Sequence, residues 1–298
     1  MKPNELIEHE PDAQEQQSKL ADRTKVMERK SLSAKGVHDA LLLEGREEIN
    51  RRWDALAWSG LASGLAMGLT LMAEGALREY LPDREWRPLI SKLGYSAGFI
   101  AVTLGRQQLY TETTLTAALP WAQDKTRETF WLVARLWLIL LLTNLIGAYL
   151  FAAAAAHTNT FSPELRESFR QIGEEAARHD FWTALVKGIF GGWLIALMVW
   201  LMPSAEGTKL WVIIIVTWLL SVTSLTHIIA GSVEVFYLVT TDAMSFGTYL
   251  MRYGIPVFIG NSIGGMILVA ALNHAQVQPD KQKEQHDTRA TRERGADE

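Results

Sequence analysis

Residues able to exchange a proton lie inside an apolar segment near the C-terminal end of the chain. The stretch SLTHIIAGSVEVF places His227, Gly231, Ser232 and Glu234 within little more than two helical turns. Histidine changes charge close to neutral pH, so it can give or take a proton where arginine cannot. An ionisable group at membrane depth is costly and by default marks a functional site. This spacing predicts such a site at His227; the alternative is a neutral histidine that joins two helices through a carbonyl or a threonine.

A second polar stretch, LGRQQLYTETTLTAALP, follows one apolar run and precedes another. In lipid every backbone polar group needs a partner, so a broken helix is tolerated only where protein or a water-filled cavity surrounds it. Gly105 and the polar residues after it therefore predict a helix that breaks, restarts near Thr113 and ends at Pro120.

The charged residues of this stretch, Arg106 and Glu112, are open to two interpretations. Arg106 either draws an anion toward the mouth of a pore, or pairs with Glu112 or Glu234 and holds the loop closed. The ion pair is favoured at this point, because an unpaired buried charge is rarely tolerated.

The elements that position these residues follow from the distribution of apolar residues. The averages, 48% hydrophobic and 21% charged residues, would fit a soluble enzyme, but the charged residues and glutamines concentrate in 1–52 and 275–298. Between them lie apolar runs long enough to cross a hydrocarbon core of about 30 Å. We therefore predict an all-α membrane protein, with a polar cytoplasmic N-terminal tail (1–52), a six-helix membrane domain (53–274) and a polar C-terminal tail (275–298).

Basic residues next to the spans favour cytoplasmic termini. An even number of spans places both termini on one side of the membrane, and the positive-inside rule selects the side. Arg51, Arg52, Lys125 and Arg127 favour the cytoplasmic side, whereas four arginines on the opposite side, Arg78, Arg84, Arg87 and Arg252, weaken that preference.

The composition also limits the classes of function. The net charge of −4 is small and comes mainly from the tails, so no nucleic-acid partner is predicted. The chain has no cysteine, which excludes disulfides, thiolate metal sites and cysteine nucleophiles. No pattern of a metal cluster, phosphate-binding glycine loop or nucleophilic triad occurs in the sequence, so neither an enzyme nor a cofactor is predicted.

Two short segments nearly repeat one another. TNLIGAYLF at 143–151 and GNSIGGMIL at 260–268 share an asparagine and, three residues later, a glycine. A three-plus-three duplication would explain this match and the two polar interruptions in spans two and five. Because three is odd, the halves would insert with opposite orientation, an arrangement that places a transport site near the membrane midplane.

These motifs together resemble the formate–nitrite transporter family, and within it the YfdC-like inner-membrane branch. The resemblance covers roughly 55–272 and is carried by KGIFGGWLIALMVWL, THIIAGS, IPVFIGNSIGG and the LYT of the second span. It implies an aquaporin-like fold with six helices, of which helices two and five are broken. It also implies a multi-pass protein of the inner (cytoplasmic) membrane, a homopentamer in which each protomer has its own pore, and a small monovalent anion such as formate or nitrite as substrate.

The resemblance also implies roles for individual residues. His227 would share a proton with the anion, so that the anion crosses the apolar constrictions nearly neutral. The inner constriction and gating loop would be Leu109, Tyr110 and Thr111, the outer constriction Phe99 and Leu220, and the further polar pore-lining residues Asn261, Arg106, Glu112 and Glu234.

The chain departs from the family pattern at several positions. Gly231 and Gly192 stand where the family usually has asparagine, and Ala176 stands where it has a vestibule lysine, with Arg178 nearby. Two alternatives to an anion channel therefore stay open. One is a non-conducting membrane protein of the same fold with a structural or envelope role, and the other is a channel for a neutral solute.

Overall fold

Helices make up all the regular secondary structure of residues 32–266, the part of the chain that the computed structural model describes. These helices belong to one unit that begins at Ala34. The predicted C-terminal tail, 275–298, and most of the N-terminal tail lie outside the described residues. Residues 34–49 of the N-terminal tail form helix α2 (Ala34–Ile49).

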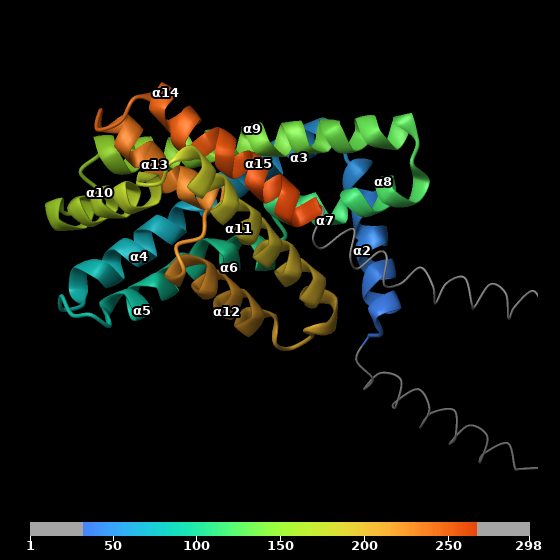
Figure 1. The fold of residues 1–298 in the computed structure, drawn as a ribbon, viewed down its shortest axis with the longest axis horizontal. Coiled ribbons are helices and arrows are strands. Elements are labelled where there is room, and N and C mark those ends of the chain that lie inside the picture. The colour runs from blue at the N-terminus through green and yellow to red at the C-terminus, as the bar shows by residue number, and fades with distance from the viewer. Residues whose placement is uncertain (1–31, 267–298) are drawn as a thin grey trace, which may run out of the picture. The chain divides into compact units, whose positions relative to one another are not determined.

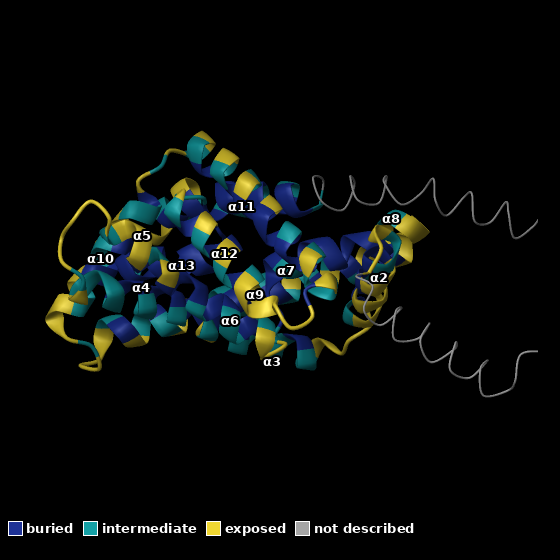
Figure 2. Ribbon diagram, turned by 90° about the horizontal axis from the view of Figure 1, so that it is seen from below, coloured by how far each residue is buried: buried dark blue, intermediate teal, exposed yellow. Residues whose placement is uncertain are grey.

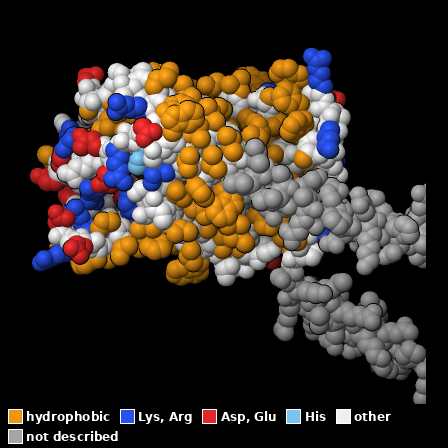
Figure 3. Space-filling view, in the orientation of Figure 1, with side chains coloured by type: hydrophobic (Ala, Val, Ile, Leu, Met, Phe, Trp, Pro, Cys, Tyr) orange, Lys and Arg blue, Asp and Glu red, His pale blue; other side chains and the backbone are white. Residues whose placement is uncertain are grey.

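Within residues 32–266, three segments are long and apolar enough to cross a membrane. They are 53–80, built from α3 (Trp53–Ala66) and α4 (Gly68–Tyr80); α9 (Arg127–His157); and 181–204, built from α11 (Phe181–Leu201) and η2 (Met202–Ser204). Much of the apolar surface of these helices is exposed, as at Trp131, Leu138 and Leu142 of α9. Figure 3 shows a broad belt of apolar side chains, with charged side chains gathered at the end of the bundle where α4, α5 and α10 lie.

The polar stretch after the first span interrupts a helix. Before the interruption the chain forms α5 (Arg87–Ser91), η1 (Lys92–Tyr95) and α6 (Ser96–Leu104), and after it α7 (Tyr110–Thr116) and α8 (Ala118–Asp124). The helix resumes at Tyr110, three residues before the predicted position. Pro120 does not end it but lies in the first turn of α8, where a backbone N–H has no partner within the helix and its loss costs little.

A second interruption has the same backbone geometry as the first. Here α12 (Lys209–Val222) ends and α13 (Ala230–Thr240) begins after a non-helical segment. Arg106 and Ser224 both take a left-handed conformation, with φ of 51° and 53°. In each break the next residue donates its N–H five residues back: Gln107 to the Val102 carbonyl (3.0 Å) and Leu225 to the Leu220 carbonyl (3.0 Å).

The remaining helices close the two ends of the bundle. Figures 1 and 2 show α2 at one end, beside α8, and α10 (Pro163–Ala177) at the other. Val37 and Leu41 of α2 are buried in a cluster with Leu115 and Leu119, while α10 begins with its Ser162 side chain accepting from the Leu165 N–H. The last described elements are α14 (Phe246–Tyr249), the π-helical turn η3 (Leu250–Gly254) and α15 (Ile255–Ile263).

Candidate functional site

A buried asparagine holds each of the two breaks. Asn144 of α9 accepts the Tyr110 N–H at Oδ1 (2.8 Å) and donates from Nδ2 to the carbonyls of Gly60 (2.8 Å) and Gln108 (3.1 Å). These three bonds use both ends of the amide. Those to Tyr110 and Gln108 supply partners for backbone groups that the missing helical turn leaves free, and the bond to Gly60 joins the break to α3.

Asn261 of α15 makes the corresponding three bonds at the second break. Its Oδ1 accepts the Ile228 N–H (2.8 Å), and its Nδ2 donates to the carbonyls of Gly188 (2.8 Å) and Thr226 (3.0 Å). Both asparagines are fully buried. The residue enclosed between the bonded neighbours is Leu109 in the first break and His227 in the second.

His227 is held by hydrogen bonds at both ring nitrogens. Nδ1 lies 3.1 Å from the N–H of Ala230 and 3.3 Å from that of Ile229, at the start of α13, and Nε2 lies 2.7 Å from Thr111 Oγ1. Two N–H donors at Nδ1 require that nitrogen to accept, so the neutral ring carries its proton on Nε2 and donates to Thr111. A second proton on Nδ1 would face these donors, so the arrangement favours the neutral form.

The predicted constriction residues divide into those that contact His227 and those that do not. Thr111 contacts it directly, and the Phe99 ring packs edge-on against the imidazole with centroids 5.0 Å apart. Leu109 and Leu220 are fully buried in the same apolar core as Phe99. Tyr110 instead turns toward α15, where its hydroxyl lies 2.7 Å from Ser262 Oγ.

Arg106 forms no ion pair with either predicted carboxylate. It is exposed, Glu112 accepts the Thr103 hydroxyl (2.7 Å), and Glu234 belongs to α13 at the other break. Arg106 instead lies near Glu44 of α2. Burial raises the pKa of Glu44, and the positive charge of Arg106 partly offsets that rise. The ion-pair interpretation of Arg106 is therefore wrong.

Helix α2 brings a further carboxyl to the first break. Glu48 accepts hydrogen bonds from the Thr116 hydroxyl and from Gln108 Nε2 (3.4 Å). Burial raises the pKa of Glu48 to about 7, with the charges of Glu44 and Glu112 adding to the rise. Glu48 could not be predicted as a site residue, because it lies in a segment whose composition is that of a tail.

The opposite end of the bundle contains a polar cavity of about 50 Å³. Lys92 and Glu74 form an ion pair in its wall, with Nζ 3.0 Å from Oε1, and Glu234 also lines it. Neither Lys92 nor Glu74 was among the predicted site residues. Glu74 could have been predicted, since it is an ionisable residue inside the first apolar span.

Close packing explains the two glycines, Gly231 and Gly192, at which the resemblance led us to expect asparagine. A Cβ on Gly231 would lie 1.6 Å from the Tyr253 hydroxyl oxygen, and a Cβ on Gly192 would lie 2.3 Å from the Asn261 carbonyl oxygen. The Tyr253 hydroxyl donates to the His227 carbonyl (3.1 Å). Tyr253 thus supplies a polar group in the space that a side chain at position 231 would occupy.

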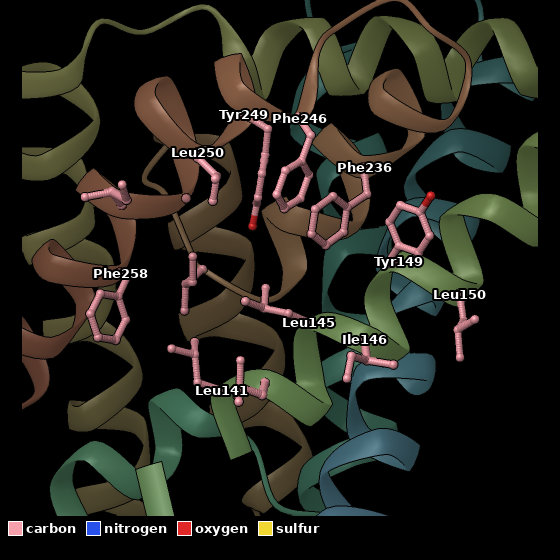
Figure 4. A pocket seen from close by; sticks show the side chains of 14 residues that line it. Leu141, Leu145, Ile146, Tyr149, Leu150, Phe236, Phe246, Tyr249, Leu250 and Phe258 are labelled. Atoms are coloured by element: carbon pink, nitrogen blue, oxygen red, sulfur yellow. The ribbon is translucent and has the colours of Figure 1, made fainter. Parts of the chain in front are cut away.

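A larger cavity of about 430 Å³ has an almost wholly apolar lining and lies between α9, α13 and the α14–α15 segment. Figure 4 shows Leu145 and Ile146 on one side and Phe236, Phe246 and Tyr249 on another. The Tyr249 hydroxyl is bonded to Ser232 Oγ (2.8 Å). With so few polar groups available to a solute, this cavity is not part of the polar site.

The sequence of nearly all of these elements matches one known family. Residues 35–275 match the model of the family described as Formate/nitrite transporter. The chain belongs to this family. It is 36% identical over 281 residues to "Inner membrane protein YfdC" of Escherichia coli strain K12, covering 93% of this chain and 91% of that protein.

More distant relatives and solved structures agree with the family and the fold. The chain is 24% identical over 245 residues to "Uncharacterized transporter YrhG" of Bacillus subtilis strain 168, covering 79% of this chain and 90% of that protein. It superposes on a pentameric formate channel with a TM-score of 0.66 at 19% identity, covering 76% of this chain and 98% of the channel. A second solved ion channel of the same family gives a TM-score of 0.65 at 15% identity, over 79% of this chain and 96% of that channel.

Proposed function

We propose that this formate/nitrite transporter family member is a channel for small monovalent anions of weak acids, similar in size to formate and nitrite. The observation that carries the proposal is the neutral His227, whose Nε2 donates to Thr111 between the two helix breaks. An Nε2–H donor surrounded by Phe99, Leu109 and Leu220 suits a solute that brings an acceptor oxygen but little net charge.

The proposed architecture has six spans in two inverted halves, with helices two and five broken. The matching left-handed residues Arg106 and Ser224 support it, as do the matching bonds of Asn144 and Asn261. Each half then contributes three spans, and because three is odd the second half crosses the membrane in the opposite direction.

The proposed pore passes both breaks. From the α2 end, a solute meets the gating loop of Leu109, Tyr110 and Thr111, then His227, and then the constriction of Phe99 and Leu220. Moving a bare charge past these apolar residues is costly, and a proton that travels with the anion removes most of the cost. The anion and the proton thus cross together as the uncharged acid, which hydrogen-bonds to His227 as it passes.

The proposed setting is the inner membrane, with both termini in the cytoplasm and five protomers in the assembly. An inner-membrane location is supported by the name of the Escherichia coli relative, and a homopentamer by the pentameric formate channel of the same fold. The exposed apolar belt of the outer helices would face lipid and the neighbouring protomers.

A channel for a neutral solute is the second candidate. It is favoured by the carboxyl groups Glu112 and Glu234 near the two breaks, because carboxylates there would repel a bare anion. A non-conducting protein with a structural role is the remaining alternative, and it predicts no flux of any solute.

Uptake by proteoliposomes tests these alternatives. We would measure the uptake of formate, acetate, nitrite and the neutral solute urea at about pH 5.5 and about pH 7.5, on either side of the ordinary histidine range. His227→Ala is compared with His157→Ala, a change at an exposed histidine at the end of α9. We expect protein-dependent uptake that rises with acidity, is lost in His227→Ala and is kept in His157→Ala. Urea uptake without anion uptake would support the neutral-solute channel, and no uptake at all would support the structural role.

A further inference from the structure

Glu234 is a buried carboxyl that has no partner among the described residues. Its residue is 7% exposed, and it forms neither a hydrogen bond nor an ion pair with any side chain or backbone group between 32 and 266. It lines the polar cavity of about 50 Å³, whose floor includes Ser224 and Thr226 of the second break. A buried carboxyl without a partner takes up a proton or a ligand, because the isolated ion is too costly to bury.

The other carboxylates around this cavity each have a cation. Glu74 pairs with Lys92 and also accepts the Ser221 hydroxyl (3.4 Å), while Glu175 of α10 pairs with Arg78 (2.7 Å). Glu234 is therefore the carboxyl of this cavity wall that no ion pair or hydrogen bond from residues 32–266 holds, although Lys92 lies in the same wall.

The titratable groups that face Glu234 come from every helix packed around α13. They are Glu74 from α4, Lys92 and Tyr95 from η1, Glu175 and His179 from α10 and its C-terminal end, and Tyr253 from η3. Tyr149 of α9 and Tyr249 of α14 contact other residues of α13, namely Phe236 and Ser232. His179 is the histidine among these groups. Burial lowers its pKa from the ordinary value, and the nearby cations Lys187 and Arg178 lower it further.

The cavity lies directly before the constriction. Tyr253 lines the cavity and donates to the His227 carbonyl (3.1 Å). Tyr95, also in the wall, packs 5.5 Å from Phe99, whose ring packs 5.0 Å from the His227 imidazole. A cavity of this volume holds a molecule of a few heavy atoms or a few waters.

We propose that Glu234 is a proton donor that neutralises a small weak-acid anion in this cavity, so that the acid enters the constriction uncharged. This inference rests on the proposed anion channel and adds the site where the proton is transferred. The Lys92 ammonium, in the same wall, favours entry of the anion into the cavity.

The transfer conserves atoms and charge. The O–H bond of the Glu234 carboxyl breaks, and a new O–H bond forms on the oxygen of the anion. The negative charge moves from the anion to Glu234 and stays in the cavity, where Lys92 stabilises it. A hydronium ion from the aqueous side then returns the proton to Glu234, and transport in the opposite direction reverses each step.

Proteoliposomes that carry a pH-sensitive dye test the proposal, with formate as the probe. We compare wild type, Glu234→Gln, and Glu174→Gln, an exposed position on α10 outside the cavity. At about pH 5.5 we expect the rates of formate uptake and of the accompanying proton uptake to be about tenfold lower, or more, in Glu234→Gln than in wild type. The variant cannot supply the proton that offsets the cost of a buried charge. Glu174→Gln should stay within about twofold of wild type. His179→Gln should keep the rise of uptake with acidity.

The outcomes separate this inference from the function on which it rests. Wild type that takes up no formate would contradict the anion channel and this step with it. Wild type that conducts, together with a Glu234→Gln variant of equal uptake and equal acid dependence, would overturn the role of Glu234 alone.

Two further measurements keep the test decisive if Glu234→Gln assembles poorly. Glu234→Asp retains a carboxyl, so it should keep proton uptake coupled to formate at a reduced rate; uncoupled formate uptake by this variant would overturn the proposal. Infrared difference spectra of the membrane-embedded protein should show a protonated carboxyl that Glu174→Gln keeps and Glu234→Gln lacks. The same band in both variants would contradict a proton on Glu234.

Discussion

The two helix breaks share a backbone and differ in the side chain that each presents. Asn144 and Asn261 make equivalent sets of three bonds, which enclose Leu109 in the first break and His227 in the second. The repeated part of the molecule is thus the scaffold that satisfies the interrupted backbone. The site itself is asymmetric, because one half supplies an apolar wall and the other a hydrogen-bond donor.

The two ends of the bundle differ in how their carboxyl groups are bonded. At the α2 end, hydroxyl groups hold the carboxyls, with Thr103 bonded to Glu112 and Thr116 to Glu48. At the α10 end, Lys92 pairs with Glu74, while Glu234 has no partner among the described residues. The hydrogen bonds of Glu48 and Glu112 suit the docking of α2 against the first break, whereas a buried carboxyl without a hydrogen bond suits proton exchange.

The largest expected effect is the loss of either asparagine. Asn144→Ala and Asn261→Ala each remove three buried hydrogen bonds, so we expect each to lower the free energy of unfolding by about 3 kcal/mol. Thermal or denaturant unfolding in detergent would measure this, with Asn159→Ala at an exposed position changing it by less than about 0.5 kcal/mol. A large loss for one asparagine and none for the other would contradict a duplicated scaffold.

The next largest effect tests whether the Tyr253 side chain explains the glycine at position 231. Gly231→Ala would drive a methyl group into the Tyr253 hydroxyl, so we expect a loss of about 1–3 kcal/mol of stability. In the double variant with Tyr253→Leu, the ring and hydroxyl are gone, and the cost of the added methyl should largely disappear. A double-mutant cycle measures this coupling. Additive effects would show that Tyr253 does not explain the glycine.

The smallest effect concerns the docking of α2 and its dependence on pH. Because burial raises the pKa of Glu48 to about 7, the docked state holds a proton that an undocked, solvated Glu48 would release. The contribution to docking is therefore full below the ordinary glutamate range and is lost as the pH rises through about 7. After correction for intrinsic exchange, the amide protons of α2 should be more strongly protected from exchange at about pH 6 than at about pH 8.

Two variants isolate the contribution of Glu48. Glu48→Gln should remove the difference in protection between the two pH values, whereas Glu47→Gln, at an exposed neighbour, should keep it. Equal pH dependence in both variants would assign the effect to another group.

Local patterns in the sequence predicted the residues that form the two breaks. The TNLIG and GNSIG motifs pointed to Asn144 and Asn261, and Gly105 with the polar residues after it pointed to the first break. The family of the chain was also predicted from its motifs and is confirmed by the match over 35–275. These features were accessible because hydrophobicity, glycine and repeated spacing are local properties of a sequence.

Contacts between distant segments could not be found in this way. Tyr253 and Gly231 meet only because η3 packs against α13, and Glu48 reaches Thr116 only because α2 folds back onto α7. The sequence suggested an ion pair for Arg106 on grounds of charge alone, but the left-handed turn leaves that side chain exposed. Pairing of charges depends on the direction of the backbone, which composition does not reveal.

The most direct test of the asymmetric site is formate uptake by His227→Leu, which gives the second break the side chain of the first. Wild type and variant are reconstituted at equal protein content, after size-exclusion chromatography shows the same assembly. We predict uptake well above that of empty liposomes for wild type and uptake equal to that of empty liposomes for His227→Leu. Equal uptake by the two proteins would contradict a channel that depends on the hydrogen-bond donor of His227.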